Sequence, residues 1–334
     1  MGYFPNIFKH AKIKLIPKPN KTATDPLNFR PISLLEVTGK IFEKIINKRT
    51  RKYLETNNIL PPQQHGFRQL RPTETATAII TEIISKALAE KKQCCLVLRD
   101  VSEAFDKVWT YGLQYKTLQL QLPHILAKIL CNFLINRTAS ISLPNHEGPP
   151  FQLHSGVLQG SSISPTLYTI YTHDIPPPAT NGTNILYADD ITQIIIQPGL
   201  SRKMLARKIE REIKHINTYE HKWKIKTNTT KFTILSIAIT KTAPVLIGGQ
   251  ITSYANKAKI LGLLLGRTGY KKHVDEISQK ANIALNTLRR FHSMDIDVKL
   301  HLVKACVLPI LKYPTYALNA LSKSQILKLQ QIQK

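Results

Sequence analysis

The chain has 334 residues, and its 43% of apolar and 20% of charged residues exclude a disordered protein and are typical of a globular one. Lys and Arg number 47 against 21 Asp and Glu, so the formal net charge is +26 and points to a polyanionic partner, nucleic acid or an anionic membrane surface. A merely soluble basic protein is the alternative. Since no stretch reaches about 18 uninterrupted apolar residues, we expect no membrane-spanning segment.

Hydrophobic periodicity predicts a series of helices and strands along the chain. In chain order these are helices over residues 39–55 and 73–91, a strand over 94–101, a helix over 122–137, a strand over 139–143 and a helix over 161–175. A tight hairpin over 183–196, a basic amphipathic helix over 201–224, strands within 231–240 and 258–266, and mostly helix from 274 onward follow. Helices and strands mix without strict βαβ alternation, which favours an α+β fold.

The cysteines carry no metal-binding or disulfide pattern. Cys94, Cys95, Cys131 and Cys306 show no CxxC spacing and no Cys/His zinc spacing, so we expect reduced thiols packed as small apolar side chains. The N-terminus shows no signal peptide. An intracellular location is therefore expected, with nucleus and cytoplasm not distinguished.

Adjacent aspartates, Asp189 and Asp190, interrupt an apolar run that is otherwise typical of buried strands. An ionised carboxylate in such surroundings costs several kcal/mol unless something compensates it. No Lys or Arg occurs between Arg137 and Arg202, so this stretch is an acidic island in a basic chain. Asp100 likewise ends an apolar strand.

A divalent cation is the compensation that this pattern favours. If the strands of Asp100 and of the aspartate pair are neighbours in one sheet, three carboxylates meet at one edge and bind Mg²⁺. Two such ions activate a 3′-hydroxyl and stabilise the leaving oxygen of a phosphoryl transfer. The alternative is that Asp189 and Asp190 are ordinary turn residues, since Asp is common in hairpins.

Several short motifs follow one another between about residues 30 and 266. They are FRPISLLEVTGKIFEKII (29–46), QHGFR (64–68), DVSEAFDKVW (100–109), GVLQGSSISPTLYTIYTHDIP (156–176), YADD (187–190), WKIKTNTTK (223–231) and KILGLLLG (259–266). Each is weak alone, but in this order they resemble the reverse transcriptase domain of non-LTR (LINE-type) retrotransposons, most closely the jockey-like group.

This resemblance implies a right-hand polymerase, α+β, with an antiparallel palm sheet flanked by helices. It assigns residues 1–93 to the fingers, 94–110 and 151–268 to the palm, 111–150 to the connection between fingers and palm, and 269–334 to a full or partial thumb. It implies an RNA template, a DNA primer and dNTPs as partners, no membrane, and the rest of a longer element polyprotein with an endonuclease. The chain is expected to be a fragment of such a polyprotein.

The resemblance also implies the roles of individual residues. Asp100 and Asp189 correspond to the main ligands of two Mg²⁺ ions and Asp190 to the neighbouring carboxylate, with Mn²⁺ as the alternative ion. Lys231 corresponds to a proton donor for the departing pyrophosphate. Phe105 occupies the position of an aromatic ring under the incoming sugar, which excludes a ribose 2′-hydroxyl. The other implied substrate-binding residues are Arg30, Arg68, Gly156, Gln159 and Gly160, and the implied primer-binding residues are Leu261 and Gly262.

Each implied role has a structural alternative. Phe105 is otherwise a core aromatic, the arginines are otherwise solvated, and Lys231 is otherwise a solvated residue at a strand start. Two positions depart from the family pattern: Arg99 stands where an apolar residue is usual, and it either pairs with Asp100 or points away from the site. Leu158 replaces the usual proline and so removes a backbone restraint before Gln159.

Three functions therefore stay open on the sequence. The first is an RNA-directed DNA polymerase, which the intact set Asp100, Asp189 and Asp190 favours. The second is a catalytically impaired remnant that still binds nucleic acid through its basic surfaces. The third is another palm-domain polymerase, such as an intron-encoded or telomere-extending reverse transcriptase.

Overall fold

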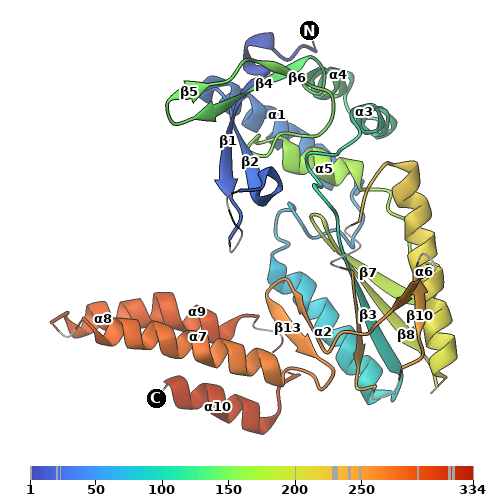
Figure 1. The fold of residues 1–334 in the computed structure, drawn as a ribbon, viewed down its shortest axis with the longest axis vertical. Helices are drawn as coiled ribbons and strands as arrows, with labels where there is room; N and C mark the ends of the chain where they lie inside the picture. The colour runs from blue at the N-terminus through green and yellow to red at the C-terminus, as the bar shows by residue number, and fades with distance from the viewer. Residues whose placement is uncertain are drawn as a thin grey trace. The chain divides into compact units, whose positions relative to one another are not determined.

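A computed structural model describes residues 2–19, 22, 24–199, 201–227, 232–239, 242–247, 250–291, 293–314, 317 and 320–333. Helices and strands are mixed along the chain, which confirms the predicted α+β class (Figure 1). The chain forms two compact units, and each is described by itself. The first unit is Met1–Phe67, Val101–Pro176 and Ile216–Asn228, and the second is Arg68–Asp100, Pro177–His215 and Thr229–Lys334.

The first unit contains a five-stranded sheet with the order β2-β1-β4-β5, in which β6 also pairs with β4. The pair β1 and β4 is parallel and the other pairs are antiparallel. The elements are η1 (Asn6–Phe8), β1 (His10–Pro17), η2 (Pro26–Asn28), β2 (Phe29–Leu34), α1 (Val37–Thr56), α3 (Thr110–Gln119), α4 (His124–Phe133), β4 (Arg137–Leu143), β5 (His146–Glu147), β6 (Phe151–Leu153) and α5 (Ser164–Tyr171).

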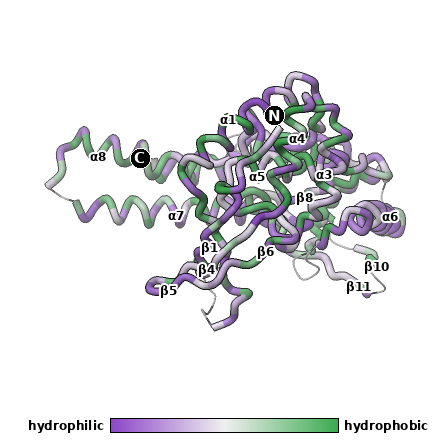
Figure 2. Tube along the Cα trace, turned by 90° about the horizontal axis from the view of Figure 1, so that it is seen from above, coloured by the Kyte–Doolittle hydropathy of each residue, from purple (hydrophilic) through white to green (hydrophobic). Residues whose placement is uncertain are grey.

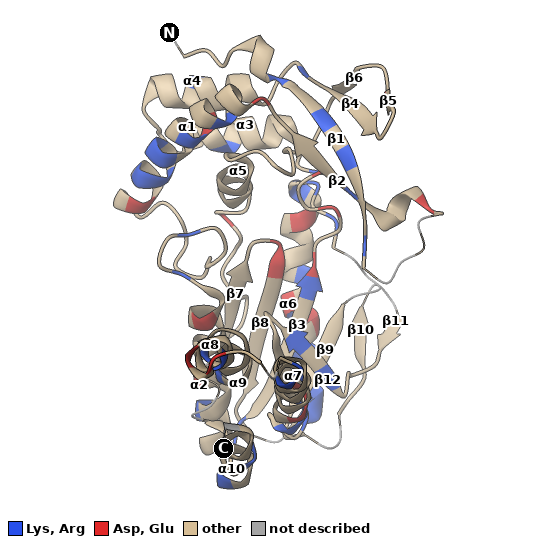
Figure 3. Cartoon of the chain, turned by 90° about the vertical axis from the view of Figure 1, so that its left-hand side faces the viewer, with Lys and Arg blue, Asp and Glu red and all other residues tan. Residues whose placement is uncertain are grey.

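Helix α1 confirms the helix predicted over residues 39–55. Its buried residues recur every three or four positions, which is the spacing of one helical face: Gly39, Glu43, Ile46, Thr50 and Leu54. Lys and Arg lie along the rest of the helix and are blue in Figure 3. The predicted basic outer face is therefore present, and one buried position on the inner face is a carboxylate.

The second unit contains a four-stranded antiparallel sheet with the order β7-β8-β3-β9. Helix α6 begins in this unit and ends in the first. The elements are α2 (Thr73–Ala89), β3 (Gln93–Asp100), β7 (Gly182–Tyr187), β8 (Asp190–Gln197), α6 (Arg202–Lys222), β9 (Thr233–Ile237), β10 (Val245–Ile247), β11 (Gln250–Thr252), β12 (Lys257–Ile260), β13 (Leu263–Gly266), α7 (Lys271–Arg289), α8 (Ile296–Leu302), the π-helical turn η4 (Val303–Val307), α9 (Leu308–Lys312) and α10 (Lys323–Gln333).

Helices cover both faces of this sheet. On one face Cys95 of β3 belongs to a buried cluster with Ile209 of α6. On the other face Leu96 is buried with Ile80 of α2 and Val274 of α7. Burial on both faces explains why β3 is a continuous apolar run rather than an alternating one. Helix α7, by contrast, alternates between hydrophobic and hydrophilic residues along its length (Figure 2).

The helix predicted over residues 122–137 is too long. Helix α4 ends at Phe133, and β4 already begins at Arg137. Asn136 has a φ of 53°, a left-handed conformation that no α-helix continues through. The predicted helix extended past this residue because residues 122–134 have apolar periodicity and Asn136 gives only a weak stop signal.

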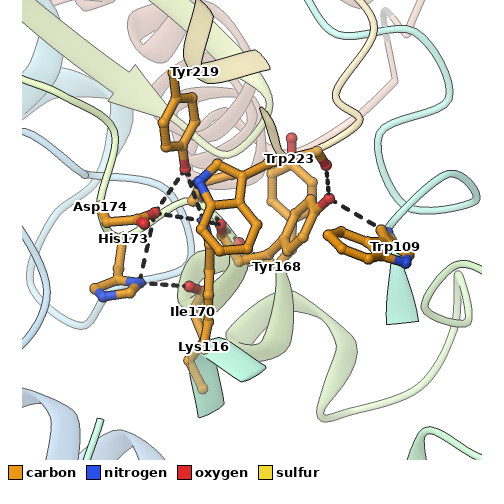
Figure 4. A network of polar contacts seen from close by, with 10 residues as sticks. Trp109, Lys116, Tyr168, Ile170, His173, Asp174, Tyr219 and Trp223 are labelled. Atoms are coloured by element: carbon orange, nitrogen blue, oxygen red, sulfur yellow. Dashed lines mark hydrogen bonds and ion pairs between the residues drawn. The ribbon is translucent and has the colours of Figure 1, made fainter. Parts of the chain in front are cut away.

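A buried lysine joins α3, α5 and α6 within the first unit (Figure 4). Lys116 of α3 donates from Nζ to Asp174 Oδ1 at 2.5 Å, to the Tyr171 carbonyl at 2.5 Å and to the Tyr219 hydroxyl at 3.0 Å. The ammonium also lies 3.7 Å from the centre of the Trp223 ring. Burial lowers the pKa of Lys116 to about 8, against the opposing effect of Asp174.

This lysine predicts a pH dependence of stability. The pKa of Lys116 is about 8 in the folded chain and 10.5 as its ordinary value, so the unfolded chain binds more protons between these pH values. The free energy of unfolding of the wild type should therefore rise above pH 8, by up to about 1.4 kcal/mol per pH unit from this one group. Lys116→Met removes that contribution.

Urea unfolding above pH 8, below the range in which free tyrosines ionise, measures the difference in slope. Lys128→Met is the matched control, because Lys128 is exposed on α4 of the same unit. We expect the control to keep the wild-type slope. Equal slopes for Lys116→Met and the wild type would contradict a lowered pKa of Lys116 in the folded chain.

Candidate active site

The predicted carboxylates come to one end of the four-stranded sheet. Strands β3 and β8 are antiparallel neighbours, and their register places Asp100 opposite Asp190. Asp189 lies in the two-residue turn that joins β7 to β8, after Ala188, whose φ is 58°. The predicted tight hairpin is therefore present. The strands of Asp100 and Asp190 are neighbours, as the metal hypothesis requires.

These carboxylates are less buried than their apolar flanks suggest. Asp100 and Asp189 are half-buried, and Asp190 is exposed. Two residues directly opposite in an antiparallel pair project from the same face, where like charges destabilise the pair. A cation between Asp100 and Asp190 would offset that repulsion. Water reduces the desolvation cost that the sequence pattern implied.

A cavity of about 290 Å³ in the second unit is lined by Asp100 and Asp190. Lys257, Lys259 and Leu261 of the β12–β13 hairpin line its other side. The carboxylates and the hairpin that the resemblance assigns to the primer thus share one cavity. Its mixed lining of carboxylate, ammonium and apolar groups suits a charged ligand with an apolar part.

The side chains present meet the requirements of a metal site only in part. Within the described residues, no group of three or more His, Cys, Asp or Glu side chains is arranged to hold a metal ion. Mg²⁺, however, usually takes one or two protein carboxylates and completes its octahedron with water and substrate phosphates. The opposed carboxylates of Asp100 and Asp190 match that requirement, and Asp189 lies next to Asp190 in the chain.

Arg99 lies on the face of the sheet opposite to Asp100. Its guanidinium donates from Nη2 to the Ile213 carbonyl of α6 at 3.0 Å and lies 5.2 Å from the centre of the Phe232 ring. Alternation along β3 puts Asp100 on the other face. Of the two predicted orientations, the structure therefore shows the one in which the guanidinium points away from the carboxylate face.

Phe105 packs among aromatic rings of the first unit. Its ring is parallel to that of Tyr168 in α5, with centroids 5.2 Å apart and an interplanar angle of 12°. The Phe67 ring meets it edge-on at 5.9 Å and 90°. Phe105 is nevertheless half-buried, so part of it faces solvent. This fixed, partly exposed ring suits a contact with a sugar, and that role stays a prediction.

The glycines of the GVLQG segment are explained by close backbone packing. A Cβ on Gly156, whose φ is 84°, would lie 2.5 Å from the Asp106 carbonyl oxygen. A Cβ on Gly160, whose φ is 128°, would lie 2.3 Å from the Ser33 carbonyl oxygen. Protein backbone thus fills the space beside both residues. Their predicted contact with substrate stays a prediction.

Gln159 ties this segment to its neighbours. Its side chain donates from Nε2 to Asp106 Oδ2 at 2.7 Å, and its carbonyl accepts from the Ser33 N–H at 2.7 Å. Burial raises the pKa of Asp106, and the bond from Gln159 opposes that rise. Arg137 donates from Nη2 to the Gly156 carbonyl at 2.5 Å. These bonds hold the segment beside the loop that carries Phe105.

Leu158, the second departure from the family pattern, is a core residue. It is 6% exposed and forms a small buried cluster with Ala11 of β1 and Ala139 of β4. Apolar packing therefore restrains the chain before Gln159, where the family usually has a proline.

Sequence reasoning missed two residues of α1 that hold the segment after Gly160. Glu43 is 1% exposed and accepts from the Ser161 hydroxyl at 2.8 Å and the Ser162 N–H at 2.7 Å. One turn later, Asn47 donates to the Ser162 carbonyl at 2.7 Å and accepts from the Thr166 hydroxyl at 2.6 Å. Burial raises the pKa of Glu43. The sequence signal that could have revealed Glu43 is a carboxylate at a position where the helical periodicity expects a buried residue.

The predicted primer-binding residues form the turn between β12 and β13. Leu261 and Gly262 have φ values of 48° and 89°, and Ile260 pairs with Leu263, so this is a two-residue hairpin turn. The Tyr313 hydroxyl donates to the Leu261 carbonyl. Tyr313 lies far along the chain, and sequence reasoning did not select it.

The remaining predicted site residues are Arg30, Arg68 and Lys231. Arg30 is exposed on β2 of the first unit, whereas Arg68 is half-buried in the second unit. Lys231 lies outside the described residues. No helix in the part of the chain that the structure describes is long and apolar enough to span a membrane.

The fold is that of a right-hand polymerase. A telomerase from Candida tropicalis in complex with a TWJ fragment of telomeric RNA matches it with a TM-score of 0.55 over 96% of this chain and 55% of that chain, at 15% identity. A truncated apo telomerase from the same organism matches with a TM-score of 0.53 over 79% and 54%, at 16% identity. The predicted antiparallel palm sheet flanked by helices is confirmed.

The chain belongs to the family described as reverse transcriptase (RNA-dependent DNA polymerase), whose model matches residues 16–265. In Drosophila melanogaster it is 30% identical to the probable RNA-directed DNA polymerase from transposon X-element, over the whole chain, and 29% identical to that from transposon BS, over 99% of the chain. It is also 28% identical to the RNA-directed DNA polymerase from mobile element jockey of the same organism. The predicted resemblance to the jockey-like group is confirmed. The chain spans 38% of the length of each of these relatives.

Replacement of Glu43 tests how the segment after Gly160 is held. Glu43→Ala leaves the Ser161 hydroxyl and the Ser162 N–H without their acceptor. A buried donor without an acceptor lowers the free energy of unfolding by about 1–3 kcal/mol. Glu43→Gln keeps an acceptor oxygen and should lose less. Urea unfolding measures both variants, with Glu36→Ala as the control, since Glu36 is exposed at the start of the same helix. Equal stability of Glu43→Ala and the control would contradict the assigned role.

Proposed function

We propose that this chain is the RNA-directed DNA polymerase domain of a non-LTR retrotransposon of the jockey-like group. The observation that carries the proposal is the register of β3 and β8, which sets Asp100 opposite Asp190 at the end of the palm sheet. Membership of the reverse transcriptase family supports it. The reaction joins a primer 3′-oxygen to the α-phosphorus of a dNTP and breaks the bond from that phosphorus to pyrophosphate.

Asp100 and Asp189 would be the main ligands of the Mg²⁺ ions, with Asp190, opposite Asp100, as the neighbouring carboxylate and Mn²⁺ as the alternative metal. When bound, these ions supply activation of the 3′-hydroxyl and neutralise charge on the leaving pyrophosphate. The carboxylates fix the position at which that charge is neutralised, because Asp100 and Asp190 stand on hydrogen-bonded strands and Asp189 lies in the two-residue turn between β7 and β8.

Other residues take the roles that the family resemblance gives them. Phe105 would exclude a ribose 2′-hydroxyl, and Gly156, Gln159 and Gly160 would lie beside the nucleotide and template. Arg30 and Arg68 would bind phosphate, for which a planar guanidinium is suited. Lys231 would give a proton to the departing pyrophosphate. The turn of Leu261 and Gly262 would position the primer end.

The proposed partners are an RNA template, a DNA primer, dNTPs and the rest of a longer element polyprotein with an endonuclease. The formal net charge of +26 supports the nucleic-acid partners, and the greater length of the relatives supports the polyprotein. An intracellular location is part of the proposal. Cys94, Cys95, Cys131 and Cys306 are free thiols, as expected in a reducing compartment.

Replacement of both turn aspartates tests the polymerase function. Asp189→Ala/Asp190→Ala removes one of the opposed carboxylates and its neighbour, so primer extension on poly(rA)/oligo(dT) with Mg²⁺ should fall by about a hundredfold or more. Binding of the same template and primer should persist. Asp275→Ala is the control, because Asp275 is partly exposed on α7 and pairs with Lys328. Equal extension by the wild type and the double variant would leave nucleic-acid binding as the function.

Phe105→Ala tests the choice of sugar. Loss of the ring should raise incorporation of a ribonucleotide relative to the matching deoxynucleotide, because the 2′-hydroxyl no longer meets a rigid surface. Single-nucleotide incorporation measures this ratio. Phe67→Ala is the control, since it removes a ring that packs against Phe105 and leaves Phe105 itself in place. An unchanged ratio together with a lower free energy of unfolding would make Phe105 a core residue only.

A further inference from the structure

Helix α3 exposes tyrosines on one face. Tyr111 is 72% exposed and Tyr115 is 58% exposed, and their spacing of four residues puts both side chains on the same face of the helix. Leu118, at the next turn of that face, is 61% exposed. Large rings that stay in water in this way form a patch, and such patches commonly mark interaction sites.

Further rings and lysines adjoin this face within the first unit. The Tyr115 ring lies 6.2 Å from the Trp223 ring, which lies 6.5 Å from the Trp109 ring. The Lys222 ammonium is 5.3 Å from the centre of the Trp223 ring, and the Lys224 ammonium is 4.3 Å from that of Trp109. We call Trp109, Tyr111, Tyr115, Lys222 and Lys224, with Trp223 at their base, the aromatic surface.

The base of the aromatic surface is held in place. Trp223 is 7% exposed, and its ring is 3.7 Å from the buried ammonium of Lys116 (Figure 4). The Tyr171 hydroxyl donates to the Trp223 carbonyl. A surface fixed from beneath loses little freedom when a ligand binds, which favours affinity.

The charge of the aromatic surface is positive. Lys222 and Lys224 are exposed. The acidic residues nearby on the same elements are engaged: Asp174 accepts from Lys116 at 2.5 Å, and Glu220 accepts from the Thr227 hydroxyl at 2.6 Å. The surface therefore offers π faces and ammonium groups together, which complements a ligand with flat rings and repeated negative charge.

We propose that the aromatic surface binds single-stranded nucleic acid. Bases stack on Tyr111 and Tyr115, and backbone phosphates pair with Lys222 and Lys224. Rings beside ammonium groups match the bases and phosphates of a single strand, whereas a duplex hides its base faces. The carboxylates proposed to bind metal take no part in this binding, so it can be measured apart from the proposed polymerisation.

Equilibrium binding of a short labelled oligo(U) and of a duplex RNA, both in EDTA, tests the proposal. Tyr111→Ala/Tyr115→Ala should weaken oligo(U) binding about thirtyfold or more and leave duplex binding unchanged, since stacking accounts for the difference. Lys222→Ala/Lys224→Ala should reduce the slope of log affinity against log salt by about 1.4 for the single strand. Tyr3→Ala and Lys91→Ala are the controls, because both residues are exposed elsewhere.

Several outcomes would overturn this assignment. Equal weakening of single-strand and duplex binding would indicate general electrostatics, and no weakening would show that the tyrosines are not used. Loss of binding to anionic phospholipid vesicles, with oligo(U) binding intact, would assign the surface to a membrane. Cross-linking of wild-type protein to 4-thiouridine RNA avoids any folding defect of the variants, and cross-links that omit Tyr111, Tyr115 and Trp109 would also count against it.

Discussion

The opposition of Asp100 and Asp190 is the constraint on which the rest of the site depends. Strand register alone decides whether these side chains share a face, because a shift of one residue would turn every side chain of β8 to the other side of the sheet. The apolar residues behind the aspartates set that register, since they are buried on both faces against α2 and α6. The packing of the core thus holds two like charges together, and a bound cation would lower the electrostatic cost of that arrangement.

Buried polar side chains hold the parts of the site that have no regular structure. The segment from Gly156 to Ile163 leaves backbone groups that no helix or strand satisfies, and such groups need partners when buried. Glu43 and Asn47 of α1 supply some of these bonds, and Arg137 supplies another at Gly156. Burial lowers the pKa of Arg137 to about 10, so even this guanidinium bears a cost for its position.

Much of the fold followed from sequence periodicity, because α1, α2, α6 and β3 bury faces that repeat at 3.6 residues or form a short continuous apolar run. The turn at Ala188 and Asp189 and the shared sheet end of Asp100 and Asp190 followed as well. The parallel pair of β1 and β4 did not, since no local pattern reports which strand a segment will join. Glu43, Lys116 and Tyr313 were missed because their partners are distant in the chain and leave no periodic signal.

The departures from the family pattern are accommodated by packing and leave the carboxylates unaffected. Arg99 belongs to the side of β3 that faces α6, where a backbone carbonyl and an aromatic ring receive its guanidinium. Leu158 fills a small core between β1 and β4. In a degenerate copy of such an element, no longer under selection, a buried charge and an altered loop would be expected to lack such partners. Since both residues have well-defined neighbours, neither departure weighs against the proposed polymerase function.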